Sequence, residues 1–184
     1  MSTSMTRRRH NITPARMAQQ AAIGIAAGLI GGLAMDLFAS MANARKGHSA
    51  QRPQAKGSED AAEKAGAIVY RAVVGHKPRR KAVKRRLGSA MHYAFSAGAG
   101  LAYAIIADVA PALRAGFGTM YGAMVWAIAD EGVTPALGLA KSPREIPLDA
   151  HLFSLGSHGI FGGTLEAVTR CAAWLPFSFR PHTR

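Results

Sequence analysis

The feature that most constrains this chain is the stretch of residues 116–170, in which two runs of small and apolar residues flank a connector containing three prolines. The runs cover residues 115–129 and 150–165, and ionisable side chains lie inside or directly beside them. These side chains are Asp130, Glu131, His151, His158 and Glu166. Charged groups are almost never buried unpaired in soluble proteins. In membrane-spanning helices they face the bundle interior and mark polar sites. The pattern therefore favours a pair of membrane-spanning helices that carry a polar site.

Composition supports this interpretation. Apolar residues make up 49% of the 184 residues and cluster in four blocks, which also contain most of the 20 glycines. A glycine costs about 1 kcal/mol in a soluble helix, whereas helices in lipid use small residues for close contact. The sequence therefore predicts an all-α protein, a polytopic bundle of four transmembrane helices with one peripheral amphipathic helix.

The four predicted spans cover residues 17–44, 87–110, 115–139 and 148–175, and each is long enough to cross a bilayer. Residues 1–16 and 176–184 form tails, and residues 45–86 form a basic connector. Glycines at four-residue spacing predict helix contacts; we select Gly24, Gly28, Gly32, Gly118, Gly122 and Gly162. The first block has an alternative interpretation, because its arginines, apolar run and ending at residues 42–44 also resemble a cleavable signal peptide. Asp36 interrupts the run, which is also long for a signal peptide.

The connector at residues 45–86 holds 13 of the 23 basic residues of a chain whose net charge is +13. An amphipathic helix is predicted at about residues 60–74, with Asp60 as its cap, Glu63 completing a capping box and Gly75 ending it. The densest charge follows at residues 77–86 and includes Arg79, Arg80, Lys81, Lys84, Arg85 and Arg86. These residues either anchor the topology or bind anionic lipid headgroups. We expect no nucleic-acid partner, and the positive-inside rule places this connector in the cytoplasm and both termini outside.

The alternation of four spans predicts which ionisable groups share a membrane face. Asp36, His92, the Asp130–Glu131 pair and His151 fall on the side of the basic connector, and His158 lies about 10 Å deeper than His151. The opposite half holds three more charged residues, Asp108, Glu166 and Arg170. Glu166 and Arg170 can form an ion pair at four-residue spacing.

Three roles compete for this polar cluster. The groups can serve only to hold helices together, they can form a proton or ion path, or they can bind a metal or haem through His92 and His151. No cofactor is identified, because the histidine spacing is not diagnostic of a metal. No enzymatic motif occurs, and the single Cys171 excludes an internal disulfide.

Four segments together resemble a bacterial membrane family, the YagU-like domain of unknown function. They are GLIGGLAMD, HYAFSAGAGLAYA, FGTMYGAMVWAIADEGVTPALGLAKSPREIPLDAH and SHGIFGGTLEAVTR. The resemblance covers most of residues 24–170 and is strongest at Trp126, Asp130, Glu131, residues 135–139, His151, His158, Gly162 and Glu166. It implies a protein of the bacterial inner membrane and supplies no activity.

The sequence thus predicts a small multi-pass inner-membrane protein that handles protons or small ions through its His and carboxylate cluster. The alternatives are a metal- or haem-binding membrane subunit and a scaffold that binds lipid or a partner through the basic connector. Association into a homo-oligomer stays open.

Overall fold

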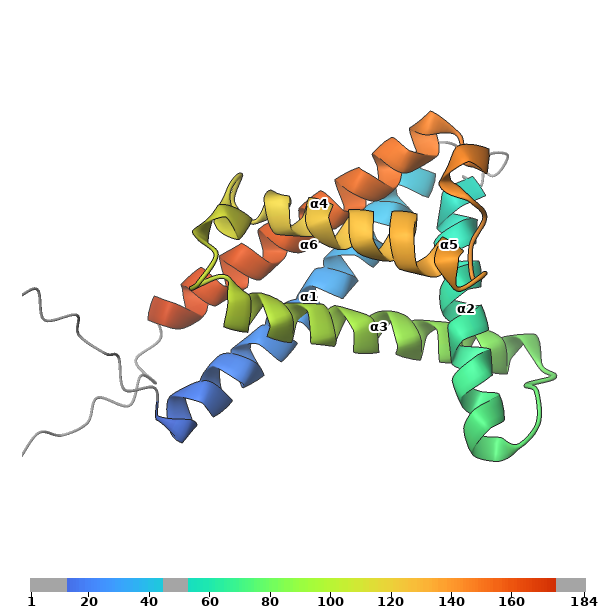
Figure 1. Cartoon of the computed structure of the whole chain (residues 1–184), viewed down its shortest axis with the longest axis horizontal. Helices are drawn as coiled ribbons and strands as arrows, with labels where there is room; N and C mark the ends of the chain where they lie inside the picture. The colour runs from blue at the N-terminus through green and yellow to red at the C-terminus, as the bar shows by residue number, and fades with distance from the viewer. Residues whose placement is uncertain (1–12, 45–52, 175–184) are drawn as a thin grey trace, which may run out of the picture.

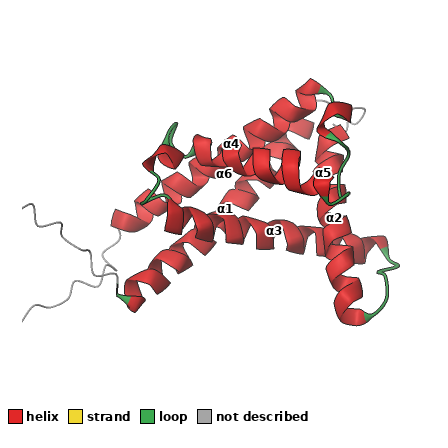
Figure 2. Cartoon of the chain, in the orientation of Figure 1, coloured by secondary structure: helices red, strands yellow, loops and turns green. Residues whose placement is uncertain are grey.

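The computed structural model describes residues 13–44 and 53–174, and within them every regular element is helical (Figure 2). The chain is therefore all-α, as predicted. The elements, in order, are α1 (Pro14–Ala44), α2 (Pro53–Val74), α3 (Lys81–Ile106), the 3₁₀ turn η1 (Pro111–Arg114), α4 (Thr119–Ile128), the π-helix η2 (Ala129–Val133), α5 (Thr134–Ala136), the 3₁₀ turn η3 (Pro143–Glu145) and α6 (Leu148–Trp174).

Four helices, α1, α3, α4 and α6, form a bundle, and α2 runs across one end of it (Figure 1). α1 packs against both α3 and α6, while α4 packs against α6. The first residues of α1 and the last residues of α6 lie at the same end of the molecule (Figure 1). The ends of α1 and α4 and the starts of α3 and α6 consequently share the other end, next to α2.

Glycines allow α1 and α3 to approach closely. A Cβ atom added to Gly28 would lie 2.1 Å from the carbonyl oxygen of Ser96, and one added to Gly24 would lie 2.7 Å from that of Gly100. Gly32 lies on the same contact, against the Ser96 hydroxyl. Any larger residue at Gly28 would push the two backbones apart, so the four-residue spacing marks a real contact surface.

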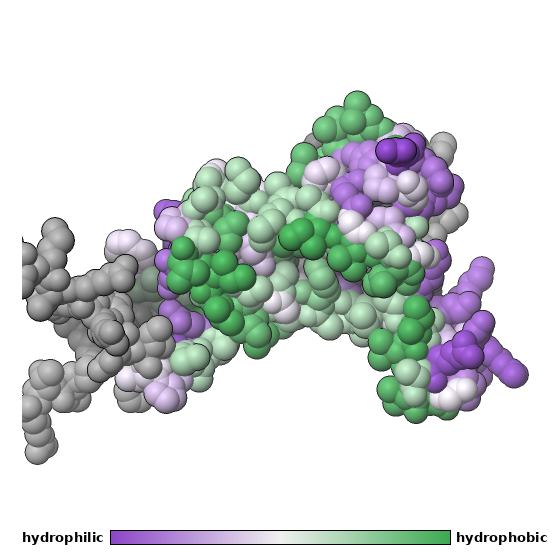
Figure 3. Space-filling model, in the orientation of Figure 1, coloured by the Kyte–Doolittle hydropathy of each residue, from purple (hydrophilic) through white to green (hydrophobic). Residues whose placement is uncertain are grey.

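Few large apolar side chains are buried, and many are exposed. The main buried cluster consists of Ala27, Tyr103, Ala107, Tyr121, Val125, Phe161 and Leu165. By contrast, one exposed face of α1 presents Ile25, Leu29, Ile30, Leu33 and Leu37. In Figure 3 hydrophobic surface covers the middle of the molecule, and the strongest hydrophilic surface lies at the end near α2. Exposed apolar surface of this extent is unusual for a soluble monomer.

Among the described residues, one helix, Pro14–Ala42, is long and apolar enough to cross a membrane by length and composition. A signal sequence or a buried core helix could meet the same test, so this helix marks a possible anchor or signal segment. α4 ends after 10 residues. α3 and α6 are long enough but carry serine, histidine and glycine in place of large aliphatic residues. Four spans are thus not established by hydropathy.

Two predicted helix starts differ from the structure. α2 begins at Pro53, not near residue 60, so residue 60 lies inside the helix and cannot be its N-cap. The predicted end is found, because α2 stops at Val74 and Gly75 follows with a positive φ of 86°. α3 begins at Lys81, six residues before the predicted span, so four basic residues of the connector form its first two turns.

The third predicted block is not one continuous helix. Gly116, Phe117 and Gly118 all have positive φ and form a turn before α4. α4 then passes into the π-helix and the short α5, which ends at Ala136. Residues 1–12, 45–52 and 175–184, which include the predicted tails and part of the connector, lie outside the described residues.

Candidate functional site

The π-helix η2 carries the Asp130–Glu131 pair and turns both side chains toward α6. Its widened turn is closed by a hydrogen bond from the Thr134 amide to the Ala129 carbonyl, five residues earlier. Pro135 explains the widening, because it has no N–H to donate to the Glu131 carbonyl and its ring would clash there in an α-helix. Single π turns inside α-helices occur frequently at functional sites.

Glu131 and His151 form a close pair between η2 and α6. The Glu131 carboxylate lies 2.7 Å from Nδ1 of His151, and the Pro143 carbonyl lies 3.0 Å from Nε2 of the same ring. A backbone carbonyl only accepts hydrogen bonds, so Nε2 carries a hydrogen. A charged His151 ring would then donate from Nδ1 to the Glu131 carboxylate, which is the geometry of a hydrogen-bonded ion pair.

Asp130 lies beside this pair and contacts α6 one turn deeper. It accepts a hydrogen bond of 2.6 Å from the Ser154 hydroxyl, and its carboxylate is 3.9 Å from Nδ1 of His158. His158 donates from Nδ1 to the Ser154 carbonyl at 3.0 Å, which fixes the ring. We call these five residues, Asp130, Glu131, His151, Ser154 and His158, the α4–α6 cluster. Its side chains are mostly buried but reach the surface at Asp130, Glu131 and His151, which are 23%, 19% and 17% exposed.

Trp126 packs next to the cluster, with its ring edge-on to His151 at a centroid distance of 6.3 Å. Its indole Nε1 is buried and has no hydrogen-bond partner among the described residues. An unpaired buried donor costs about 1–3 kcal/mol. Trp126 thus gives the cluster one apolar wall and one unused donor.

Asp36 and His92 form a separate group between α1 and α3. Nε2 of His92 lies 3.6 Å from the Asp36 carboxylate, which also accepts a 2.7 Å hydrogen bond from the Tyr93 hydroxyl. No hydrogen bond or ion pair joins Asp36 or His92 to the α4–α6 cluster within the described residues. The ionisable residues grouped from the sequence are therefore bonded in separate sets, one between α1 and α3 and one between η2 and α6.

Glu166 lies at the opposite end of the bundle, as predicted, and forms a third group. Its side chain is fully buried and is held by Arg170 at 2.7 Å, by Arg114 at 3.1 Å and by the Tyr103 hydroxyl. Arg114 also binds Asp108 at 2.9 Å. Burial acts to lower the pKa of the Arg114 guanidinium, but Glu166 and Asp108 raise the pKa overall. This network ties the turn after α3 to α6 and leaves no free charge within it.

The basic residues selected from the sequence lie at the end of the bundle near α2. Arg79 and Arg80 precede α3, and the others occupy its first two turns; all six are exposed. None of the six forms an ion pair with any residue that the structure describes. Positive charge at a helix N-terminus opposes the helix dipole.

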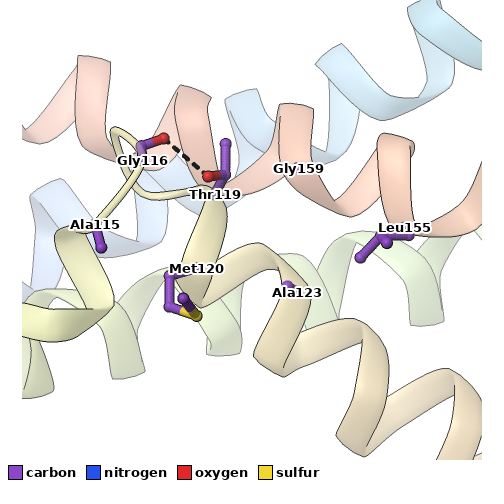
Figure 4. Close-up of a pocket in the computed structure, with 7 residues that line it drawn as sticks. All are labelled: Ala115, Gly116, Thr119, Met120, Ala123, Leu155 and Gly159. Carbon is purple, nitrogen blue, oxygen red and sulfur yellow. Dashed lines mark hydrogen bonds between the residues drawn. The ribbon is translucent and has the colours of Figure 1, made fainter.

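A hollow of about 330 Å³ opens between the start of α4 and α6 (Figure 4). Its lining is Ala115, Gly116, Thr119, Met120, Ala123, Leu155 and Gly159. The Thr119 hydroxyl donates internally to the Gly116 carbonyl. The hollow contains none of the ionisable residues selected from the sequence.

The described residues contain no group of three His, Cys, Asp or Glu side chains that could hold a metal ion. His92 and His151, the pair considered for a metal or haem, belong to different helix contacts, at α1–α3 and at α4–α6. The metal alternative therefore has no three-donor site in this part of the chain.

Sequence reasoning missed three residues that complete these groups. Tyr103 and Arg114 were not assigned to the Glu166 site, although Arg114 is the only basic residue in the turn after α3. Trp126 was seen only as a resemblance position. None of the three has a local pattern that would reveal its partner, because each partner is far away in the sequence.

These observations define a class: an all-α protein with an ionisable site on a π turn between two packed helices. Residues 81–167 match the model of a family described as a protein of unknown function, DUF1440. The matched segment runs from the start of α3 almost to the end of α6 and so includes the α4–α6 cluster and Glu166. No curated protein and no solved structure matches the chain.

Proposed function

We propose that this protein is a four-span membrane protein that binds and releases protons, or exchanges them for a small cation, at the α4–α6 cluster. The observation that carries the proposal is the Glu131–His151 pair, in which a carboxylate on a π turn lies within hydrogen-bond distance of an imidazole and next to a second carboxylate. Histidine and carboxylate groups inside membrane helices are the usual elements of proton relays.

The distribution of side chains supports the four spans. Within α3 and α6 the buried polar residues are Ser96, Ser154, Ser157, His158 and Glu166. The same two helices expose Phe95, Ile105, Leu148 and Leu152. Polar inside and apolar outside is the arrangement expected in lipid.

A YagU-like protein of the bacterial inner membrane is the finer identity that we propose. Its supports are the sequence resemblance over residues 24–170 and the DUF1440 match, which covers Asp130, Glu131, His151, His158 and Glu166. The family description itself supplies no reaction.

The cluster has a direction within the bundle. Asp130, Glu131 and His151 are partly exposed at the end near α2, and His158 lies two turns further along α6. At the other end the Glu166 network is neutral and fully paired. We therefore expect protons to enter and leave from the α2 end.

The experiment uses the purified full chain in vesicles that contain a pH-sensitive dye. A membrane potential should drive proton uptake, and Glu131→Gln or His151→Gln should abolish it. Glu145→Gln is the matched control, because Glu145 is an exposed glutamate with no ion pair in the described chain. The proposal fails if wild type moves no more protons than empty vesicles, or if the three variants behave alike. Resistance of the native protein to alkaline extraction from membranes checks integration separately.

A further inference from the structure

The apolar stripe of α2 is only half covered by protein. Ala61, at the start of the stripe, is 6% exposed, whereas Ile68, Val69 and Val73 further along are 60%, 51% and 81% exposed. These residues recur at helical spacing and so belong to one face. The buried half lies over the bundle, and the exposed half continues the same face beyond it.

Exposed basic residues follow this exposed half closely along the chain. Exposed lysines and arginines occupy Arg71, Lys77, Arg79, Arg80, Lys81, Lys84, Arg85 and Arg86. No acidic residue occurs between Glu63 and Asp108 in the sequence. None of the eight forms an ion pair within the described part of the chain. The positive charge of this region is therefore free to act on an external partner.

The apolar surface and the hydrophilic surface lie on different sides of the part of the molecule that extends beyond the bundle. α2 runs across the end of the bundle and extends past α3 (Figure 1). In Figure 3 this projecting part shows hydrophobic surface toward the bundle and hydrophilic surface on its outer side. If the bundle axis follows the membrane normal, α2 lies parallel to the membrane surface with its apolar face toward the acyl chains.

We propose that α2 and the first two turns of α3 form an interfacial element that binds anionic phospholipids. Its apolar stripe enters the boundary between headgroups and acyl chains, and its basic residues bind the phosphates. This inference rests on the proposed membrane insertion but not on proton binding. Amphipathic helices with a basic face bind membranes in this way, and basic residues next to a membrane are attracted by anionic lipid.

Charge and apolarity together select this occupant. A nucleic acid would leave the apolar stripe uncovered, and a second copy would bring an equal positive charge to the same surface. An anionic membrane surface matches both features.

The test places a fluorescent probe at one of two neighbouring positions on α2 in a Cys171→Ser background. Val69→Cys lies on the stripe, and Val74→Cys is the matched control, because it is also an exposed valine, at 46%, but points away from the stripe. Both full-length proteins are reconstituted into vesicles with or without phosphatidylglycerol. Quenching is measured with lipids that carry a nitroxide near the headgroup and with aqueous iodide.

We expect lipid quenching at Val69 and iodide quenching at Val74. Lipid quenching at Val69 should weaken without phosphatidylglycerol, after Arg79→Gln/Arg80→Gln/Arg85→Gln, and in about 1 M salt, where the Debye length falls to about 3 Å. Equal iodide quenching at both positions would overturn the proposal. So would protection of Val69 from both quenchers, which would indicate a protein partner, or quenching that ignores lipid charge and salt. Because Glu131→Gln should leave these results unchanged, failure here is separate from failure of the proton site.

Discussion

Replacing Gly122 with alanine tests the packing of α4 against α6, on which the α4–α6 cluster depends. A Cβ atom at Gly122 would lie 1.9 Å from the carbonyl oxygen of His158 and 2.7 Å from its carbonyl carbon. Both atoms belong to the backbone and cannot rotate away. Gly159, next to His158 on α6, is the matched control, because a Cβ atom there would meet nothing within 4 Å.

The expected magnitudes follow from these distances. Raising the Gly122 contact from 1.9 Å to the 3.4 Å of ordinary van der Waals contact requires the helices to separate by about 1.5 Å. A gap of about 0.5–1 Å already forfeits a quarter to a half of the dispersion energy of the atoms along it. We therefore expect Gly122→Ala to cost near the upper end of the range of about 1–3 kcal/mol for overpacking. Gly159→Ala should instead stabilise by up to about 1 kcal/mol through helix propensity.

The assay is reversible unfolding of the full chain in mixed detergent micelles, followed by helical circular dichroism. The two variants should differ in unfolding free energy by up to about 4 kcal/mol, the overpacking cost and the propensity gain combined. Equal stability of the two variants, or a more stable Gly122→Ala protein, would refute the close backbone contact between α4 and α6.

Two further pairs of variants test the ionisable groups by the same unfolding assay. Glu131→Gln and His151→Ala should each lower the free energy of unfolding. The double variant should lose less than the sum of the two single losses, with a coupling energy of about 1–3 kcal/mol. If the losses add within about 0.5 kcal/mol, the pair is not coupled. Glu166→Gln should cost about 3–5 kcal/mol, because it leaves two arginines without their buried partner. Asp108→Asn should cost at most about 1 kcal/mol, because Asp108 is 61% exposed; equal losses at Glu166 and Asp108 would contradict the buried network.

Local patterns predicted much of the secondary structure. The all-α class followed from apolar blocks separated by proline and charge, and α6 begins at the predicted residue, Leu148. Gly75 ended α2 as expected, because only glycine takes its left-handed conformation without strain. The pairing of Glu166 with Arg170 was also readable, because both lie on one helix at four-residue spacing.

The residues at which α2 and α3 begin were harder to predict from the sequence. Propensity at residues 53–60 is weak, and the charges at residues 81–86 oppose a helix start, yet both segments are helical. α2 and α3 pack against each other, with Gly66 of α2 touching Leu87 of α3. Packing between helices outweighs the few tenths of a kcal/mol per residue that propensity supplies.

The sequence by itself determined which residues are ionisable, which end of the bundle each occupies and where helices can approach closely. Alternation of helices settles these points, because each connector reverses the chain. Only the tertiary structure decided which groups meet: Asp36 with His92, Glu131 with His151, and Glu166 with Arg114. The reason is that the position of a residue along the bundle axis follows from its place in the sequence. Which side chains of two helices meet depends instead on the rotation of each helix about its own axis and on the helices packed against it. The π turn at residues 129–133 belongs to the same category, since it rotates Asp130 and Glu131 toward α6.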